Sequence, residues 1–167
     1  HHVLVEQLQP LLATIGQLVR AETAMRAGRE GEQRLAATIE AARVGTWDWD
    51  VQSGELIINE RWAGILGYTL VELMPINVSV WYRLGHPQDL EHAHAQLLAN
   101  FRGELDYYDA EVRMRHKAGH WVWIHSRGRI ASWDSNRRPI KMYGTHTDIT
   151  ERKRAEARLQ QSETRLR

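Results

Sequence analysis

Seven tryptophans among 167 residues are the feature of this chain with the clearest chemical potential. Large aromatic side chains gathered in one small domain could line a pocket for a flat cofactor. They could also form the hydrophobic core and its interfaces, because aromatic residues dominate the energetics of burial, and we favour this second explanation. The chain contains no cysteine, which excludes disulfides, thiolate metal ligands and cysteine nucleophiles.

Four charged residues fall on neighbouring predicted strands and could bind a carboxylate or phosphate through paired hydrogen bonds. They are Glu111, Arg113, Arg127 and Arg129. More often such residues form cross-strand ion pairs on an exposed rim, which have small net value.

Catalytic signatures are missing from the sequence. We find no glycine-rich phosphate loop, nucleophile elbow or HExxH motif, and we expect no enzymatic activity in this chain. The 22 basic and 21 acidic residues give a net charge of +1, which does not suggest a nucleic-acid surface. No apolar run is long enough to cross a bilayer, and no signal peptide is visible. We therefore expect a cytoplasmic segment, although the parent protein could be membrane-anchored.

The middle of the chain has the periodicity of an α+β domain. Alternation of apolar and polar residues from Thr46 predicts a strand, and a turn at Ser53-Gly54 leads into a second strand. Asn59 is placed to cap a short helix. Five further elements follow: short helix 69–74, helix 87–101, and strands 106–115, 120–133 and 139–149. This order predicts a five-stranded antiparallel sheet with short helices on one face. Apolar residues on both faces of residues 121–130 predict a sheet covered on both sides.

Residues 3–43 are predicted to form one long helix or two joined helices. Apolar residues repeat at spacings of three and four, a heptad seam that predicts a homodimer through a coiled coil. The residues assigned to this dimer interface are Leu8, Leu11, Ile15, Leu18 and Met25. Gly28 and Gly31 interrupt the seam, and we expect a break or a phase shift there.

At the other end, a predicted strand turns directly into a charged helix. Asp148 can cap that helix, and Glu151, three residues later, can reach back to it, which is the spacing of a capping box. We expect Asp148, Thr150 and Glu151 to transmit movement from the core to the helix.

Five motifs give the chain a family resemblance. In chain order they are G-T-W-D-W-D from Gly45, N-E-R-W-A-G-I-L-G-Y from Asn59, G-H-P-Q-D from Gly85, G-H-W-V-W-I-H-S-R-G from Gly119, and Y-G-T-H-T-D-I-T-E-R-K-R from Tyr143. The chain resembles PAS domains of the bacterial PAS/PAC type (PAS-3-like) over about residues 44–153. The resemblance implies a PAS fold flanked by long N- and C-terminal helical linkers.

The resemblance also implies a domain arrangement. Residues 1–43 would be a signalling helix, or the tail of an upstream GAF domain, because residues 11–24 resemble the last helix of that fold. Residues 44–150 would be the PAS domain, and 151–167 a linker to a further domain. The parent would be a sensor histidine kinase of a two-component system or a cyclic-di-GMP enzyme. Its partners would be a second copy and the neighbouring GAF, PAS and output domains.

Relatives in this superfamily bind flavin or haem. For this chain we rank the absence of a cofactor first, FAD or FMN second and haem third. The candidate walls for a flat ligand are Trp62, Trp81, Tyr108 and Trp123. Without cysteine, the flavin–cysteinyl photoadduct of light-sensing relatives is excluded. His92 or His94 would be the haem ligand, yet their surroundings resemble a solvated helix face. Two functions therefore stand beside each other: a sensor that binds a ligand or partner and passes a signal through its helices, and a ligand-free module that sets dimer geometry.

Overall fold

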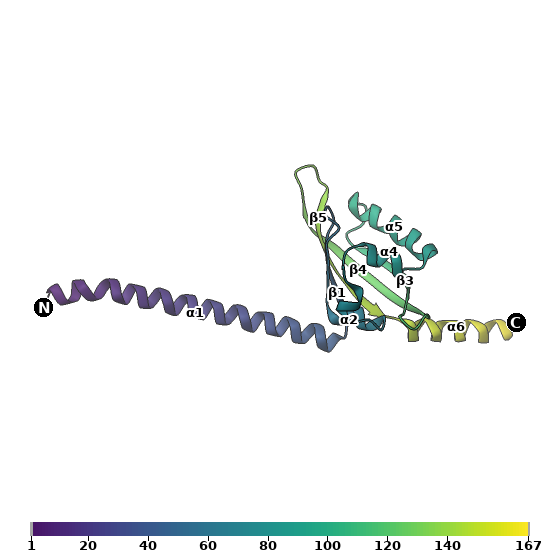
Figure 1. Ribbon diagram of the computed structural model, residues 1–167, viewed down its shortest axis with the longest axis horizontal. Coiled ribbons are helices and arrows are strands. Elements are labelled where there is room, and N and C mark those ends of the chain that lie inside the picture. Colours follow the sequence, from purple (N-terminus) through teal and green to yellow (C-terminus); the bar gives the residue numbers. More distant parts are fainter. Residues whose placement is uncertain (1, 167) are drawn as a thin grey trace. The chain divides into compact units, whose positions relative to one another are not determined.

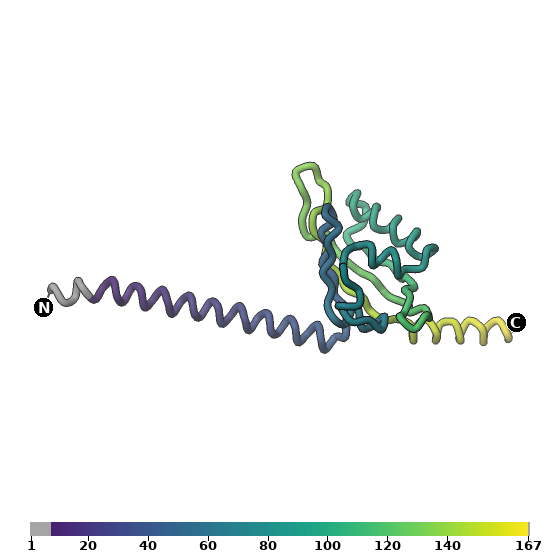
Figure 2. Tube along the Cα trace, in the orientation of Figure 1, coloured from purple at the N-terminus to yellow at the C-terminus, as the bar shows by residue number. Residues whose placement is uncertain are grey.

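The computed structural model describes residues 2–166, with side chains from Leu8 to Leu166 (Figures 1 and 2). It divides into two compact units, residues 1–42 and residues 43–167, and each is described by itself. No helix within residues 2–166 has the length and apolar character needed to cross a membrane.

The first unit is a single helix, α1 (His2–Ala42). It continues without interruption through Gly28 and Gly31, so of the two alternatives expected there the break is wrong, and the phase shift of the seam stays a prediction. Each glycine costs a helix about 1 kcal/mol relative to alanine, but good helix formers such as Arg29, Glu30 and Gln33 lie around them. The apolar residues of the seam are exposed, from 48% at Leu8 to 64% at Leu18 and Met25.

The second unit is built on an antiparallel sheet of five strands in the order β2-β1-β5-β4-β3. The strands are β1 (Gly45–Asp50), β2 (Leu56–Ile58), β3 (Tyr108–Arg115), β4 (Trp121–Trp133) and β5 (Pro139–Asp148). The first and last strands of the unit, β1 and β5, are neighbours at the centre of the sheet. The predicted fold class is confirmed, with strand ends within two residues of those expected.

Helices cover one face of this sheet, which we call the inner face (Figure 1). They are α2 (Glu60–Ile65), α3 (Leu70–Leu73), α4 (Ser79–Leu84) and α5 (Pro87–Phe101). Asn59 caps α2 as predicted: its side-chain oxygen accepts from the backbone N–H of Trp62 at 3.0 Å and from that of Thr46 at 2.9 Å. The same amide oxygen therefore fixes the start of α2 and ties it to β1.

On the outer face, the expected cover is only partly present within this unit. The final helix, α6 (Thr150–Arg165), contacts β4 through its first turn. Further along the sheet, Ile57 and Tyr143 are 57% and 49% exposed.

Trp47 holds the three central strands of the inner face together. Its partner across β1 and β5 is Gly144, and the partner of Gly144 across β5 and β4 is Gly128. A Cβ atom on Gly144 would lie 2.1 Å from the Trp47 ring, and one on Gly128 would lie 2.3 Å from it. The indole therefore lies against a floor that only glycine can provide.

This contact makes Gly144 sensitive to a single added methyl group. In Gly144→Ala the new Cβ would also lie 2.2 Å from the carbonyl oxygen of Arg127 on the neighbouring strand. We expect the free energy of unfolding to fall by about 3 kcal/mol, since overpacking against backbone cannot be relieved by a rotamer change. Chemical denaturation measures it.

Gly64→Ala is the matched control. Gly64 is a helical glycine with nothing within 4 Å of an added Cβ. Its replacement should leave stability unchanged or raise it by up to about 1 kcal/mol. Equal effects of the two substitutions would contradict the proposed seating of Trp47.

Candidate functional site: an aromatic cavity and a strand-to-helix junction

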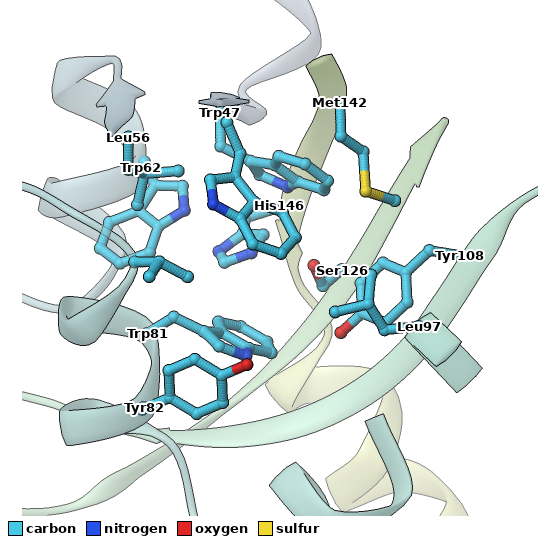
Figure 3. A pocket seen from close by; sticks show the side chains of 12 residues that line it. Trp47, Leu56, Trp62, Trp81, Tyr82, Leu97, Tyr108, Ser126, Met142 and His146 are labelled. Carbon is cyan, nitrogen blue, oxygen red and sulfur yellow. The ribbon is translucent and has the colours of Figure 1, made fainter. Parts of the chain in front are cut away.

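A small cavity of about 60 Å³ lies between the inner face of the sheet and the helices (Figure 3). Its walls are mainly aromatic and aliphatic. The lining residues are Trp47, Trp49, Leu56, Trp62, Val78, Trp81, Tyr82, Leu97, Tyr108, Ser126, Met142 and His146. Strands β1, β2, β3, β4 and β5 and helices α2, α4 and α5 all contribute to it.

Three of the four predicted wall residues line this cavity: Trp62, Trp81 and Tyr108. The fourth, Trp123, does not, and its assignment to the wall is corrected. Side chains alternate along a strand, and Trp123 lies between the buried Val122 and Ile124, so it projects from the outer face. There its ring is 4.9 Å from the Lys153 ammonium of α6.

His146 of β5 is the cavity residue with the most perturbed chemistry. Its ring stacks on Trp62 with centroids 5.0 Å apart and lies 5.3 Å from the ring of Trp81 (Figure 3). Burial first, and then the nearby His125, lower the pKa of His146 to about 3. His146 is therefore neutral at physiological pH.

The sequence reading missed His146, Trp47 and Trp49 as wall residues. The alternation of β5 is a usable signal, because it places Met142, Gly144 and His146 on one face. Their partners on β1 are Trp49, Trp47 and Gly45, in that order. This signal requires the pairing of β1 with β5, which lie almost one hundred residues apart in sequence, and periodicity within a single strand does not reveal it.

The second feature is the junction between β5 and α6, where Asp148 and Thr150 are joined. Asp148 accepts hydrogen bonds from the backbone N–H of Thr150 at 2.9 Å and from its hydroxyl at 2.6 Å. Thr150 in turn accepts from the backbone N–H of Trp123 at 3.1 Å, and Ile149 N–H donates to the Trp123 carbonyl at 2.9 Å. The start of α6 is thus fixed to β4 through Trp123.

The predicted capping box is not formed within residues 2–166. The N-cap position belongs to Ile149, which offers no side-chain hydrogen bond, and Asp148 lies one residue earlier. From there its carboxylate reaches Thr150 instead of the backbone N–H of Glu151, and the side chain of Glu151 is exposed.

Ionic contacts hold the first turn of α6 on the outer face. The Glu111 carboxylate accepts from Arg152 at 2.6 Å and also pairs with Lys153. Hydrogen bonds from Lys153 and then Arg152 lower the pKa of Glu111. Arg113 contacts the same tryptophan: its guanidinium lies 5.2 Å from the centre of the Trp123 ring and 2.7 Å from the Asp89 carboxylate.

The contacts of the four charged residues do not form the anion site that the sequence suggested. Glu111 pairs with α6 and Arg113 with α5. Arg127 lies 3.6 Å from Asp109, and both Arg127 and Arg129 lie over the ring of Tyr107. The four residues form separate contacts and do not converge on one ligand.

The PAS fold family (PAS_3) matches residues 55–146, which is more than half of the chain. The chain belongs to the PAS family. The match spans β2, β3, β4, most of β5 and all the helices of the inner face, and the family resemblance of the motifs is confirmed.

Solved structures of PAS domains from signalling proteins are similar to this domain. A crystal structure of a sensory box histidine kinase/response regulator from Burkholderia thailandensis is 34% identical, with a TM-score of 0.70, and the match covers 80% of this chain and 97% of that one. The N-terminal domain of a diguanylate cyclase with PAS/PAC sensor from Marinobacter aquaeolei is similar in fold, at 21% identity and a TM-score of 0.56 over 65% of this chain and 97% of that one.

Curated relatives are much longer proteins. The non-motile and phage-resistance protein of Caulobacter vibrioides is 27% identical over 89% of this chain and 17% of its own length. The methyl sulfide methyltransferase-associated sensor of Methanosarcina acetivorans is 28% identical over 85% of this chain and 14% of its own length. The chain thus spans less than a fifth of either relative.

Flavin and haem do not fit the site as it is arranged here. A cavity of about 60 Å³ is far below the several hundred Å³ of pockets that hold drug-sized ligands. His92 and His94 are both exposed on α5, while Ala93 between them faces the core. Neither histidine lines the cavity.

The lowered pKa of His146 makes stability depend on pH. The unfolded state takes up a proton near pH 6.5 and the folded state only near pH 3, so stability falls as the pH drops through this window. Between pH 7 and pH 5 we expect this histidine to account for a loss of about 2 kcal/mol. In His146→Leu that part of the loss should disappear from denaturation curves measured at both pH values.

His92→Leu is the control for this measurement, because His92 is exposed on α5. It should retain the full pH dependence of the original chain. If His146→Leu also retains it, His146 is not buried in a neutral form.

Proposed function

We propose that this PAS domain is a non-catalytic sensing relay within a longer signalling protein. In this proposal a small occupant of the aromatic cavity changes how the first turn of α6 is held, and α6 carries the change to a domain that follows. One relative named as a sensor and a solved structure named as a sensory box histidine kinase/response regulator support a place in signal transduction. A histidine kinase or a cyclic-di-GMP enzyme would be the parent.

The observation that carries the proposal is the short path along β5. His146 lies in the cavity wall, Asp148 is two residues further on, and Thr150 begins α6. A change in the packing of His146 between Trp62 and Trp81 would act on a strand end that is fixed to α6. Differential binding to two arrangements of this junction is the physical requirement for such a signal.

A second candidate is a ligand-free assembly module, in which the domain sets the geometry of a dimer. The exposed apolar seam of α1 favours it, because a lone helix leaves these side chains in water. In both candidates α1 joins two copies of the chain.

The relay predicts a local effect of Asp148→Ala. Loss of the bonds to Thr150 should cost about 0.5–2 kcal/mol, as for a lost N-terminal cap. Amide hydrogen exchange should become faster in residues 150–160 and change little in the sheet. Glu156→Gln, which removes only exposed contacts to Arg152 and Lys153 on the same helix, is the control and should change exchange less. A global loss of protection in Asp148→Ala would make Asp148 a residue of the folding core and not of a relay.

The seam predicts a homodimer through α1. Replacing Leu11, Ile15 and Leu18 with glutamate would place charges along the seam, and light scattering should then report monomers. Replacing the exposed Gln17, Arg20 and Thr23 with glutamate adds the same charges outside the repeat of the seam; it is the control and should leave the dimer intact. A dimer that survives the glutamate substitutions would place the interface elsewhere.

A further inference from the structure

We propose that the cavity binds a small uncharged molecule that carries a hydrogen-bond acceptor, such as a short ketone, amide or alcohol. This inference rests on the proposed function, because it names the chemical class of the occupant of the same cavity. Three properties of the walls support it: their lack of charge, one unpaired donor, and their size.

The first property is the absence of charge among the lining residues. Eleven of the twelve carry no group that ionises near neutral pH, and the twelfth, His146, is neutral. Burial likewise raises the pKa values of the phenols of Tyr82 and Tyr108, so both stay protonated. A carboxylate or an ammonium ion would lose its hydration without meeting an opposite charge, which is strongly unfavourable.

The second property is an unpaired donor on a residue of the wall. Two buried side-chain polar atoms lack a partner among the described residues, Trp49 Nε1 and Asn100 Oδ1, and only Trp49 lines the cavity. The neighbouring Trp47 on the same strand does have a partner, since its Nε1–H donates to the carbonyl of Thr145 at 3.4 Å. An indole N–H can only donate. Its missing partner is therefore an acceptor atom, and because the N–H is enclosed by protein atoms, the Trp49 side chain must turn to present it to an occupant of the cavity.

Further polar groups in the walls can add to this bond. A neutral imidazole presents one N–H and one bare nitrogen, and the ring of His146 is part of the wall. The hydroxyl of Ser126 and the phenol of Tyr108 lie beside it (Figure 3). An occupant with a hydroxyl or an amide N–H can donate to these groups, whereas a simple ketone uses only its acceptor.

The third property is size. A volume of about 60 Å³ exceeds the space of one water molecule several-fold but is much smaller than a flavin ring system requires. A molecule of about four non-hydrogen atoms is in scale with it. Such a ligand has few contacts, so we expect dissociation constants from about 0.1 mM to tens of mM.

Acetamide, acetone, acetate and acetamidinium test the proposal, because all four are planar, have four non-hydrogen atoms and differ mainly in charge. Each is titrated into the full chain with ¹⁵N-labelled indole groups, and the N–H signals are followed by NMR. We expect acetamide and acetone to move the Trp49 signal downfield in a saturable way and to leave Trp133 unchanged, since Trp133 is 42% exposed and outside the cavity. Acetate and acetamidinium should bind at least tenfold more weakly.

Trp49→Phe removes the donor and keeps an aromatic ring in the wall. It should weaken acetamide binding about 3- to 10-fold, while Trp133→Phe should leave it unchanged. Acetate or acetamidinium binding as well as acetamide would overturn the proposal, as would the absence of a saturable shift with either neutral compound. The titration of the original chain decides the question even if Trp49→Phe fails to fold.

The same samples separate this inference from the relay. Amide exchange in residues 150–160 is measured with and without saturating acetamide. A Trp49 shift with unchanged exchange would keep the ligand class and overturn the relay. Amide exchange that changes without a Trp49 shift would keep the relay and overturn the ligand class.

Discussion

The close approach of Trp47 to Gly144 and Gly128 is the constraint on which the rest of the second unit depends. The three residues are opposite one another on β1, β5 and β4. Because side chains alternate along each strand, this register decides which residues face inward. It turns Met142 and His146 toward the cavity and leaves Thr145 and Tyr143 on the outer face. A slip of one residue would put His146 in solvent and a threonine in the core.

Local chemistry explains why so much of this fold can be predicted from the sequence. Asn59 before α2 and Pro87 at the start of α5 act through their own backbone neighbourhood, and both helices begin where these residues indicate. The helix α4 was not predicted: its N-cap, Val78, provides no capping side chain, and the Asn77 side chain that accepts from the Ser79 N–H lies one residue earlier. Asp148 and Glu151 had the spacing of a capping box, but the helix begins one residue later than that pattern assumed.

The candidate site was harder to predict because it is assembled from distant strands. Trp62 and Trp81 were predicted from residue type and Tyr108 from the family resemblance, and residue type also suggested Trp123, which belongs to the other face. His146 acquires its chemistry only when β5 lies beside β1 and Trp62 and Trp81 close around the ring. The same aromatic residues that identify the region also fill it, and this is why the remaining cavity is small.

Trp123 and Ile124 are neighbours in β4, yet different interactions hold them: ionic contacts around Trp123 and apolar burial around Ile124. Ile124 is 1% exposed in the hydrophobic core, and its burial depends on temperature in the way that apolar hydration does. The cations of Arg113 and Lys153 lie over the ring of Trp123, and Glu111 joins this surface to α6 through contacts that dissolved salt screens. Ionic strength therefore acts on the attachment of the exit helix while leaving the aromatic interior almost untouched. Heat acts on both faces, whereas dissolved salt acts mainly on the outer one, so the two faces of a single strand respond differently to a change in ionic strength.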